Sequence, residues 1–379
     1  MLRLRAFSAT GYRSLRAIHC PVSDLEVFVG GNGVGKTNLY RALELVRAAA
    51  ANTLGYDLAN EGMEQALWAG PRTRGKPVRI ILSVDLADDE RGGRGYYRYE
   101  VEIGFAPPEA APAFEVEPQI KTEQLSYIGG GRTVRLIDRV NASVMARGED
   151  GRPAEIDLDL LASETVLGRL DDPGRYPALD LVRRTLLGWR FHHDLRTDAA
   201  SPLRRPCPAV ASPTLASDGA NLAAVFATLK YIREDTRDLD RLIAQAFAGA
   251  RLSVPSPGRM ATFAMVYPEF PQREFGPEEL SDGTLRFLAL AGALLAYRLP
   301  PFMAFNEPES SLHPDLTEPL AALVATASTR SQLWLVTHST AFAQALEGHG
   351  AKARTVIKKD GATWIEGLKL TGAFKDEDD

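Results

Sequence analysis

The start of the chain alternates between apolar and polar positions in a way that predicts three strands, a loop and a helix. Leu2 to Phe7 and Leu15 to Ile18 have the two-residue period of a half-exposed strand pair. Leu25 to Val29 is apolar except for Glu26, which is typical of a buried strand. A glycine-rich stretch follows, and Thr37 to Ala50 then has the spacing of a helix.

The next part of the chain, from Val78 to about Val144, has a β pattern. Apolar-rich runs predict strands over 78–84, 96–105 and 114–128. The turn-rich segment Asp88 to Gly93 predicts a hairpin that joins the first two strands.

Longer helical patterns and short apolar runs fill the rest of the chain. Leu160 to Ala248 is mainly helical, and Asp218-Gly219 is expected to cap one of its helices. Ser281 to Tyr297 is apolar nearly all round, which predicts a buried helix. Phe302 to Phe305 and Gln332 to Val336 are short apolar runs that each precede a helix, as in a parallel α/β sheet.

The last residues predict a closing hairpin and a frayed end. Ala351 to Lys359 and Ala362 to Leu370 are strand-like on either side of the turn Asp360-Gly361. The acidic tail from Lys375 to Asp379 is expected to fray.

Composition excludes several classes of protein. With 45% hydrophobic and 25% charged residues, the chain is neither disordered nor fibrous. Its longest apolar run, Phe287 to Tyr297, is far shorter than the ~20 residues of a membrane span. Cys20 and Cys207 are too few for a disulfide framework or a zinc cluster, so we expect a cytosolic protein. A net charge of −5 argues against a general attraction to nucleic acid, although it permits a local basic groove.

One segment between a predicted strand and a predicted helix fits the phosphate-loop pattern G-x-x-x-x-G-K-[ST]. Its residues are Gly30, Gly31, Asn32, Gly33, Val34, Gly35, Lys36 and Thr37, with Asn38 next to them. Glycines let successive N–H groups point at one anion, and the helix start adds its positive end. We expect Lys36 to reach the β- and γ-phosphates of ATP and the Thr37 hydroxyl to bind Mg²⁺. The alternative is a glycine-rich turn followed by a chance Lys-Thr pair.

Three later motifs place polar residues at the ends of the apolar elements. Leu280-Ser281-Asp282-Gly283-Thr284 opens the buried helix, where a helix N-terminus offers a second anion site. The runs 302–308 and 334–339 end in Asn306-Glu307-Pro308 and Thr337-His338-Ser339. Each motif alone is weak evidence for a nucleotide site, and their occurrence together in this order is strong evidence.

The order of the four motifs resembles that of ABC-type ATPases: Walker A, signature, Walker B with catalytic glutamate, and switch histidine. The box from Glu307 to Pro314, E-P-E-S-S-L-H-P, is similar to that of predicted ATPases related to RecF and SMC proteins, and Gly11 to Leu15 resembles their early F-R-S-L element. The resemblance implies an α/β P-loop NTPase head with a mixed or parallel sheet. We expect this head over 1–75 and 250–379, with a β-rich subdomain over 76–159 and a helical insertion or lid over 160–249.

The resemblance also implies a mechanism. Two heads would stack head to tail, each ATP lying between Lys36 and Thr37 of one chain and Ser281, Asp282 and Gly283 of the other. Glu307 would polarise the attacking water, His338 would contact the γ-phosphate, and the turn 310–313 would lie at the dimer seam. Alternatively, His338 is a core histidine and Ser281 a plain helix cap. Arg13 matches the family's early arginine near the nucleotide, but it is equally compatible with a surface arginine.

One position departs from the family pattern. The residue before the catalytic glutamate is usually an aspartate that holds Mg²⁺ through water, and here it is Asn306. An amide keeps an oxygen acceptor but lacks the negative charge. We therefore expect slow hydrolysis, unless another carboxylate compensates or an amide serves equally well.

The middle of the chain leaves partners open. Repeated prolines over 100–260 exclude a long coiled coil. The adjacent His192 and His193 would point to opposite sides of a strand, which favours a structural or surface role over a metal site. Five arginines could line a DNA groove or could simply pair with carboxylates: Arg183, Arg184, Arg196, Arg204 and Arg205.

The sequence therefore predicts an ATP- and Mg²⁺-dependent homodimeric ATPase with no membrane segment, related to DNA repair or anti-phage defence. The alternatives are an ATP-gated binding module and a regulatory subunit that drives a separate effector protein. The glutamine that senses the γ-phosphate is not fixed; the candidates are Gln65, Gln119 and Gln124.

Overall fold

The computed structural model of the protein describes residues 2–71, 78–87, 95–106, 113–193, 195–369 and 372–374. Its contacts divide the chain into two compact units. Unit 1 consists of Met1–Ser23, Gly30–Trp189 and Arg354–Asp379, and unit 2 of Asp24–Val29 and Arg190–Ala353. The predicted hairpin turn Asp88 to Gly93 and the acidic tail Lys375 to Asp379 lie outside the described residues.

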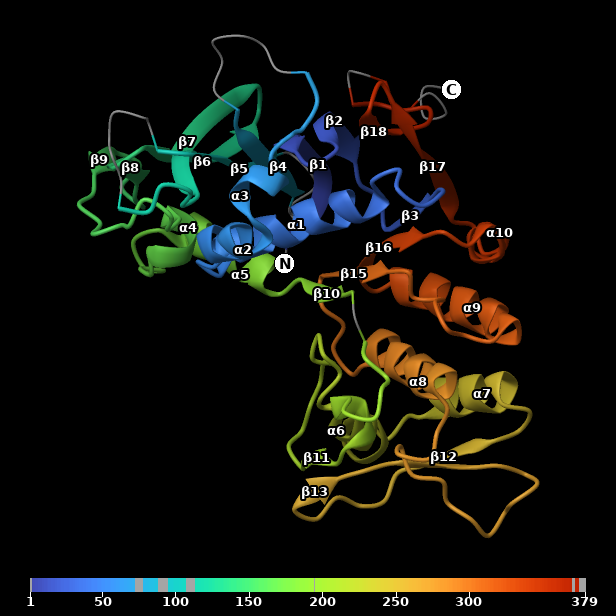
Figure 1. Cartoon of the computed structure of the whole chain (residues 1–379). Helices are drawn as coiled ribbons and strands as arrows, with labels where there is room; N and C mark the ends of the chain where they lie inside the picture. The colour runs from blue at the N-terminus through green and yellow to red at the C-terminus, as the bar shows by residue number, and fades with distance from the viewer. Residues whose placement is uncertain are drawn as a thin grey trace. The chain divides into compact units, whose positions relative to one another are not determined.

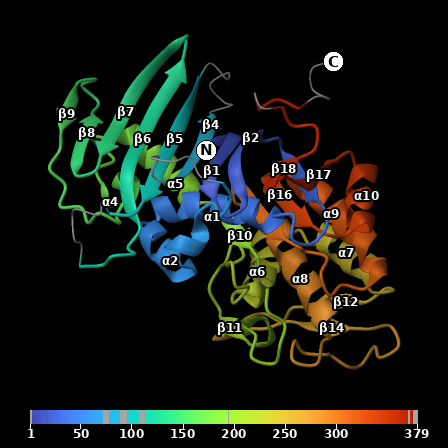
Figure 2. The ribbon, with the colours of Figure 1, turned by 45° about the horizontal axis from the view of Figure 1, so that its top comes forward.

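Unit 1 contains an eight-stranded antiparallel sheet, whose long central strands lie side by side in Figure 2. The order is β2-β1-β4-β5-β6-β7-β8-β9. The strands are β1 (Arg3–Tyr12), β2 (Leu15–Pro21), β4 (Ile80–Ala87), β5 (Gly95–Gly104), β6 (Gln119–Gly129), β7 (Arg132–Val140), β8 (Ser143–Arg147) and β9 (Pro153–Glu155). Alternating buried and half-buried positions along β1 and β5 show that one face of these strands packs on a core.

The described residues of unit 1 also form five helices and one hairpin (Figure 1). The helices are α1 (Lys36–Ala50), α2 (Leu54–Glu61), α3 (Met63–Ala66), α4 (Val166–Arg169) and α5 (Pro177–Leu187). Helix α1 contacts β1, β4, α2 and α5. The hairpin is β17 (Lys352–Lys359) and β18 (Ala362–Ile365), with positive φ at Asp360 and Gly361, and its turn is the predicted one.

The four strands of unit 2 are the parallel part of a six-stranded sheet and have the order β10-β15-β16-β3. These are β3 (Leu25–Val29), β10 (Arg190–His192), β15 (Phe302–Asn306) and β16 (Gln332–Thr337). Every residue of β16 is buried, as is usual for a strand covered on both faces. The predicted apolar runs and their parallel pairing are confirmed.

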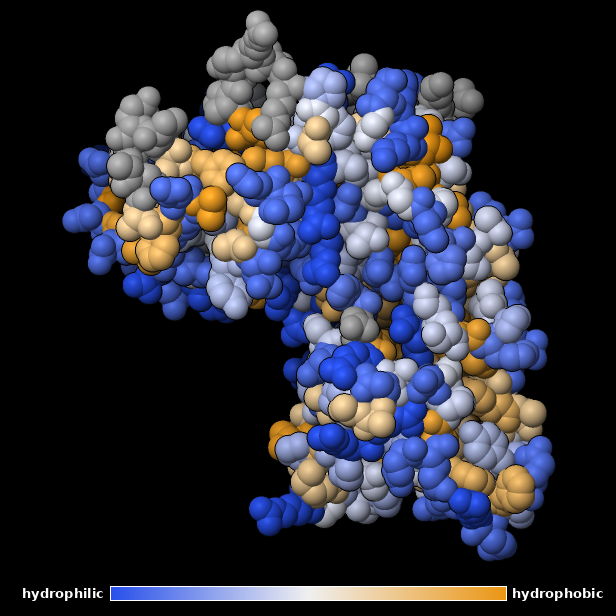
Figure 3. Space-filling model, viewed as in Figure 1, coloured by the Kyte–Doolittle hydropathy of each residue, from blue (hydrophilic) through white to orange (hydrophobic). Residues whose placement is uncertain are grey.

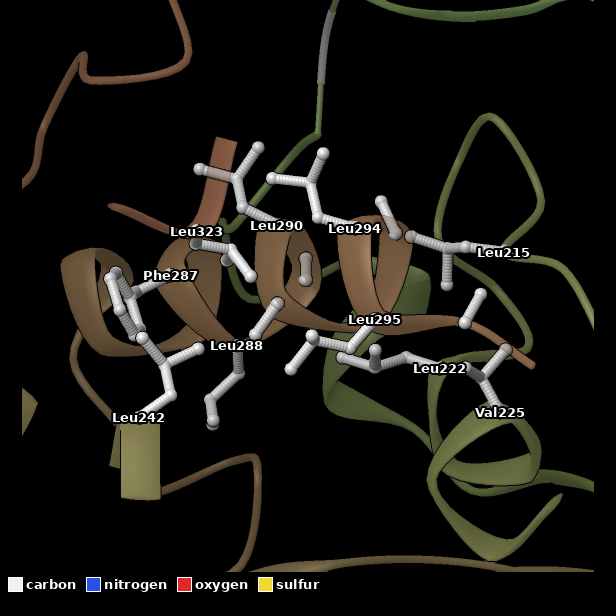
Figure 4. Packing of buried hydrophobic residues seen from close by; sticks show 14 of the residues in the cluster. Leu215, Leu222, Val225, Leu242, Phe287, Leu288, Leu290, Leu294, Leu295 and Leu323 are labelled. Carbon is white, nitrogen blue, oxygen red and sulfur yellow. The ribbon is translucent and has the colours of Figure 1, made fainter. Parts of the chain in front are cut away.

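The core of unit 2 surrounds helix α8 (Asp282–Leu295), as Figure 4 shows. Leu288 and Leu295 of this helix pack in one cluster with Leu222 and Leu242 from other helices. The surrounding helices are α6 (Leu222–Thr228) with the π-helical turn Leu229–Arg233, α7 (Arg237–Ala246), α9 (Thr317–Ser328) and α10 (Thr340–Gly348). The prediction of a helix buried on all sides is confirmed.

Short elements connect these helices. Two-stranded ladders pair β11 (Cys207–Pro208) with β13 (Met260–Ala261) and β12 (Arg251–Ser253) with β14 (Ala264–Val266). One-turn 3₁₀ helices are formed by Pro202–Arg204 and Pro314–Leu316. In the part of the chain that the structure describes, no helix is long and apolar enough to cross a membrane.

Two local predictions are wrong. The third β-rich run begins at Gln119 rather than Phe114, because Pro118 has no N–H to donate to a ladder. Asp218-Gly219 does not cap α6, whose N-cap is Asn221. Asp218 instead accepts a hydrogen bond from the N–H of Ala220, which closes a turn before the helix.

The segment 160–249, expected as one helical insertion, contributes to both units. Its first helices, α4 and α5, contact α1 in unit 1, whereas α6 and α7 pack on α8 in unit 2. Helix α8 is apolar on all sides and needs neighbours around its whole circumference. The three-part division of the chain stays a prediction.

Candidate functional site

The carboxyl ends of three parallel strands in unit 2 meet at one edge of the sheet. The ladders pair Asn306 of β15 with Val336 of β16, and Thr337 of β16 with Val29 of β3. The residues that directly follow the three strands are Glu307, His338 and Gly30. In open parallel sheets, ligands bind beyond the carboxyl ends of the strands. The register therefore brings Glu307 and His338 to a single edge of unit 2, and the chain leaves β3 at the same edge.

Glu307 has a left-handed backbone, with φ of 50°. For a residue with a side chain this conformation costs about 1–2 kcal/mol, so the surroundings must hold it. Its N–H donates to the carbonyl of Val336 at 2.7 Å. Its carboxylate Oε1 lies 3.2 Å from Nδ1 of His338. With Nδ1 turned toward the glutamate, Nε2 is the histidine nitrogen left for another ligand.

Two buried oxygens at this edge have no hydrogen-bond partner among the described residues. They are Oδ1 of Asn306 and Oε2 of Glu309. The Glu309 side chain is only 8% exposed, and its other oxygen accepts a hydrogen bond from the Thr337 hydroxyl. Burial raises the pKa of Glu309 above its usual range. Because buried polar atoms are rarely left unpaired, these oxygens make the edge a candidate ligand site.

The signature motif forms the N-terminus of α8. The Ser281 hydroxyl accepts a hydrogen bond from the Thr284 N–H at 3.2 Å, so Ser281 is an exposed N-cap. A Cβ on Gly283 would lie 2.8 Å from the carbonyl oxygen of Ser311, which leaves no room for a side chain there. The glycine thus lets the helix start pack directly on the turn that follows Glu307.

Arg204 fixes the loop in front of the signature. Its guanidinium donates to the carbonyls of Pro277 and Leu280, each at 2.9 Å, and to Asp282 at 2.6 Å. The Arg204 side chain is only 12% exposed. This arginine was a candidate for a DNA groove, and the structure uses it to hold the main chain that leads into α8.

The phosphate loop lies in unit 1 and has the conformation of a backbone cradle. Gly33 and Gly35 have φ of 78° and 96°, which is unfavourable for residues with a side chain. A Cβ on Gly31 or Gly33 would meet nothing within 4 Å, so this stretch borders open space. Nζ of Lys36 folds back onto the carbonyls of Gly30 at 2.6 Å and Gly31 at 2.8 Å.

The N-terminus of α1 lacks the usual side-chain cap. Its N-cap Gly35 makes no side-chain hydrogen bond, and the first turn contains no acidic residue. The N–H groups and dipole of this helix start are therefore suited to an external anion. The contrast with α8, which Ser281 caps, shows that the two helix starts are built differently.

A pair of hydroxyls supports the loop from behind. The Thr363 hydroxyl donates to the carbonyl of Val34 at 2.8 Å and lies 2.6 Å from the Ser14 hydroxyl. Ser14 also accepts from the amide of Asn38 at 2.6 Å. A Cβ on Gly35 would lie 1.9 Å from the Thr363 hydroxyl, so only glycine fits. Thr363 had no motif to mark it, since it lies far from the loop in sequence.

Arg13 forms an ion pair within unit 1. Its guanidinium donates to Glu61 at 2.9 Å, and its N–H donates to the carbonyl of Ala66. Its φ is 47°, so it forms the turn that places Ser14 next to Asn38. Its role at the nucleotide stays a prediction.

The glutamine candidates have different surroundings. Gln124 donates to Asp138 at 3.0 Å and Gln119 accepts from Lys121 at 2.8 Å, both within the unit 1 sheet. Gln65 lines a cavity of about 640 Å³ beside Tyr56 and Phe114, which are largely exposed. Apolar residues gather on the surface of unit 1 in Figure 3. None of these contacts singles out a γ-phosphate sensor.

The two adjacent histidines have different surroundings. His192 is buried and stacks on Phe305 with ring centroids 5.0 Å apart, whereas His193 is exposed. Burial lowers the pKa of His192 to about 4. The described residues contain no group of three or more metal-ligating side chains, and Asp194 lies outside them.

Most of the arginines considered for a DNA groove pair with carboxylates. Arg183 pairs with Asp171 and Arg184 with Asp180. Arg196 pairs with Asp198. With Arg204 bound to the signature loop, this leaves Arg205 alone among the five with no role assigned by the structure. The contacts support the carboxylate-pairing alternative.

Part of the chain matches a known family model. Residues 173–343 match a family model described as "AAA domain, putative AbiEii toxin, Type IV TA system". The matched range contains residues 280–284, 302–308 and 334–339, and it begins well after the glycine-rich loop at residues 30–37. A comparison with curated proteins gave no match.

Solved structures of SMC heads are similar to the whole chain. One is an SMC head bound to the C-winged helix domain of ScpA, with 16% identity, a TM-score of 0.53, and coverage of 97% of this chain and 99% of that one. Another is the SMC head with an extended coiled coil from Pyrococcus furiosus, bound to the C-terminal domain of ScpA. It has 15% identity, a TM-score of 0.52, and coverage of 100% and 99%.

The protein has the fold of SMC head domains, and residues 173–343 match the AAA domain model. The predicted fold class and the resemblance to RecF/SMC-like ATPases are confirmed. The roles of individual site residues stay predictions.

Proposed function

We propose that the protein is an ATPase that binds Mg·ATP and dimerises head to tail around it. The observation that supports this most is the shared strand edge, from which the phosphate loop, Glu307 and His338 all continue. Each of these features would be ordinary alone. Together they supply a phosphate cradle, a carboxylate for water and a second polar contact for a phosphate.

The residues present fit ATP and Mg²⁺. The uncapped start of α1 and the open glycines of the loop suit a triphosphate, and Lys36 would exchange its two carbonyl contacts for phosphate oxygens. The Thr37 hydroxyl and the unpaired amide oxygen of Asn306 would hold Mg²⁺. When bound, the ion neutralises charge on the phosphates.

The chain's own groups would then act on water and phosphate. Glu307 would accept a hydrogen bond from the attacking water and orient it. His338, held through Nδ1, would present Nε2 to the γ-phosphate. Ser281 and Gly283 would complete the site of a second subunit, because the start of α8 is exposed and bears N–H groups.

A second function, an ATP-gated regulatory module, is favoured by one observation. Asn306 puts an amide where the family has a carboxylate, so the ion would be held with less charge. Hydrolysis would then be slow, and bound ATP would mainly set the assembly of the protein with an effector partner. The DNA-related role in repair or anti-phage defence is a further proposal that a DNA arm of the experiment addresses.

The test is steady-state phosphate release from Mg·ATP by wild type, Glu307→Gln and Lys36→Ala, with and without duplex DNA. We expect Glu307→Gln to lower turnover at least about 100-fold with ATP binding retained. Lys36→Ala should lose ATP binding itself. Turnover accelerated by DNA supports the DNA-related role. Bound ATP without turnover above Glu307→Gln supports the gated module, and no ATP binding by wild type overturns both proposals.

A further inference from the structure

A single arginine inside the apolar helix α8 contacts the main chain of the catalytic glutamate. Nη2 of Arg286 donates to the carbonyl oxygen of Glu307 at 2.9 Å, and its Nε donates to that of Pro308 at 3.3 Å. Most other positions of α8 are buried and apolar, so a charged side chain here needs a reason. The two carbonyls supply that reason.

The hydrogen bonds of Arg286 help to hold the strained backbone of Glu307. Glu307 has φ of 50°, and its N–H is held by the carbonyl of Val336 in β16. Its carbonyl accepts from Ser310 N–H at 3.1 Å as well as from Arg286, which uses both lone pairs. The left-handed backbone that aims the Glu307 carboxylate is therefore fixed from β16 on one side and from α8 on the other.

The same helix turn touches the following loop at a second point. Gly283 and Arg286 lie three residues apart and so share one face of α8. Gly283 packs against the Ser311 carbonyl, with 2.8 Å between that oxygen and the place of a Cβ. The start of α8 is thus docked on residues 307–311 through a close main-chain approach and two charge-assisted hydrogen bonds.

We propose that Arg286 is a positioning residue that ties the signature helix to the main chain of Glu307 in its own subunit. This inference rests on the proposed function, in which Ser281 and Gly283 bind the nucleotide held by a second subunit. A shift of the α8 start on nucleotide binding is then passed through Arg286 to Glu307. Each subunit hydrolyses its own ATP only when its signature helix is engaged, so the two sites of the dimer are coupled.

The first experiment separates turnover from binding. Arg286→Met keeps an unbranched apolar stem and removes the donors, whereas Arg286→Lys keeps one charged donor group but not the fork. Arg298→Met is the matched control, since Arg298 is exposed after the end of α8 and stacks on Tyr297. ATP affinity is measured in proteins that also carry Glu307→Gln, so that ATP is not hydrolysed. The mass of the dimer in the presence of ATP is measured by light scattering.

We expect Arg286→Met to lower kcat about 10- to 100-fold, because small misplacements of a catalytic group have effects of this size. ATP affinity and dimer mass should stay within about threefold of wild type, and Arg286→Lys should recover part of kcat. An unchanged kcat overturns the proposal. A joint loss of kcat, ATP affinity and melting temperature, absent in Arg298→Met, also overturns it, because it indicates a purely structural role.

A second measurement does not depend on hydrolysis. Hydrogen exchange is followed at the amides of Ser310 and Leu312, which donate within the turn after Glu307. In wild type we expect ATP to slow this exchange, and in Arg286→Met we expect fast exchange with or without ATP. Equal exchange in both proteins overturns the coupling even if wild type shows no turnover. Failure of the ATPase proposal is seen separately, as wild-type turnover no higher than that of Glu307→Gln.

Discussion

One buried ion-pair cluster in unit 1 differs from the strand ends of unit 2 in how its polar atoms are paired. In unit 1, Glu123 and Arg139 are each 1% exposed and lie 3.7 Å apart. Glu123 also accepts from the N–H groups of Val166 and Leu167 and from the Tyr99 hydroxyl. In unit 2, Oδ1 of Asn306 and Oε2 of Glu309 are buried without partners among the described residues.

The difference suggests a structural role for the Glu123 cluster and a ligand-binding role for the strand ends of unit 2. The Glu123 network closes on itself and fixes α4 to the sheet through the helix N–H groups, so it has no capacity left for a ligand. The strand ends of unit 2 keep free acceptors at a position where parallel sheets bind ligands. Changes in the first region should therefore alter stability, and changes in the second should mainly alter turnover.

The largest effect is expected for Glu123→Ala, which leaves Arg139 buried without its carboxylate. We expect a loss of about 3–5 kcal/mol in the free energy of unfolding, measured by urea denaturation. The matched control is Glu102→Ala in the same sheet, where a half-buried pair with Arg79 should contribute less than about 1 kcal/mol. Equal losses for the two variants would break the comparison.

His192 lies in the parallel sheet, and we expect it to affect stability rather than turnover. Its folded pKa of about 4 lies below its ordinary 6.5, so the unfolded chain takes up a proton first as pH falls. The stability present above pH 6.5 is then lost down to about pH 4, by roughly 3 kcal/mol. His192→Phe should remove this slope from pH-dependent melting, whereas substitution of the exposed His313 should not. A wild-type slope in His192→Phe would show that other groups cause it.

Asn306→Asp addresses the free amide oxygen directly. An added carboxylate should hold Mg²⁺ more tightly and raise turnover several-fold, up to about tenfold, which corresponds to about 1.4 kcal/mol. The measurement is the rate of phosphate release as a function of Mg²⁺ concentration. An unchanged or lower rate would mean that the amide serves equally well or that Glu309 already supplies the charge.

The smallest effect is expected for Glu309→Gln. Because burial raises the pKa of Glu309, the unfolded chain loses its proton at lower pH than the folded chain. Stability is therefore full below the ordinary glutamate pKa and declines as pH rises, and Glu309→Gln should lessen that decline. The slope should be smaller than that of His192. Melting between pH 5 and 8 measures it, with the exposed Glu347→Gln as control; identical slopes in both variants would contradict the prediction.

Much of the fold could be predicted from sequence where the signal is local. The strand before Gly30, the helix after Lys36 and the apolar runs of β15 and β16 each lie within a few residues of their motif. The hairpin at Asp360-Gly361 is equally local, because two residues with positive φ define its turn. Domain division was less accessible, because the helices of 160–249 are assigned to the two units by the neighbours they cover.

The residues that support the site could not be predicted from the sequence in this way. Thr363 contacts Ser14 and Val34 across most of the chain length, and no spacing rule connects them. Arg286 had one sequence signal, a charge within an apolar helix. For Arg204 the sequence left a DNA contact and a carboxylate pair equally open.

The sequence by itself determined the four motifs, their order and the strands and helices that bear them, since backbone cradles and helix starts are built from consecutive residues. Only the tertiary structure decided that β3, β16 and β15 end in register, that Arg204 and Arg286 bind main-chain carbonyls, and that Asn306 and Glu309 keep free oxygens. These depend on register and burial, which arise when distant segments pack together.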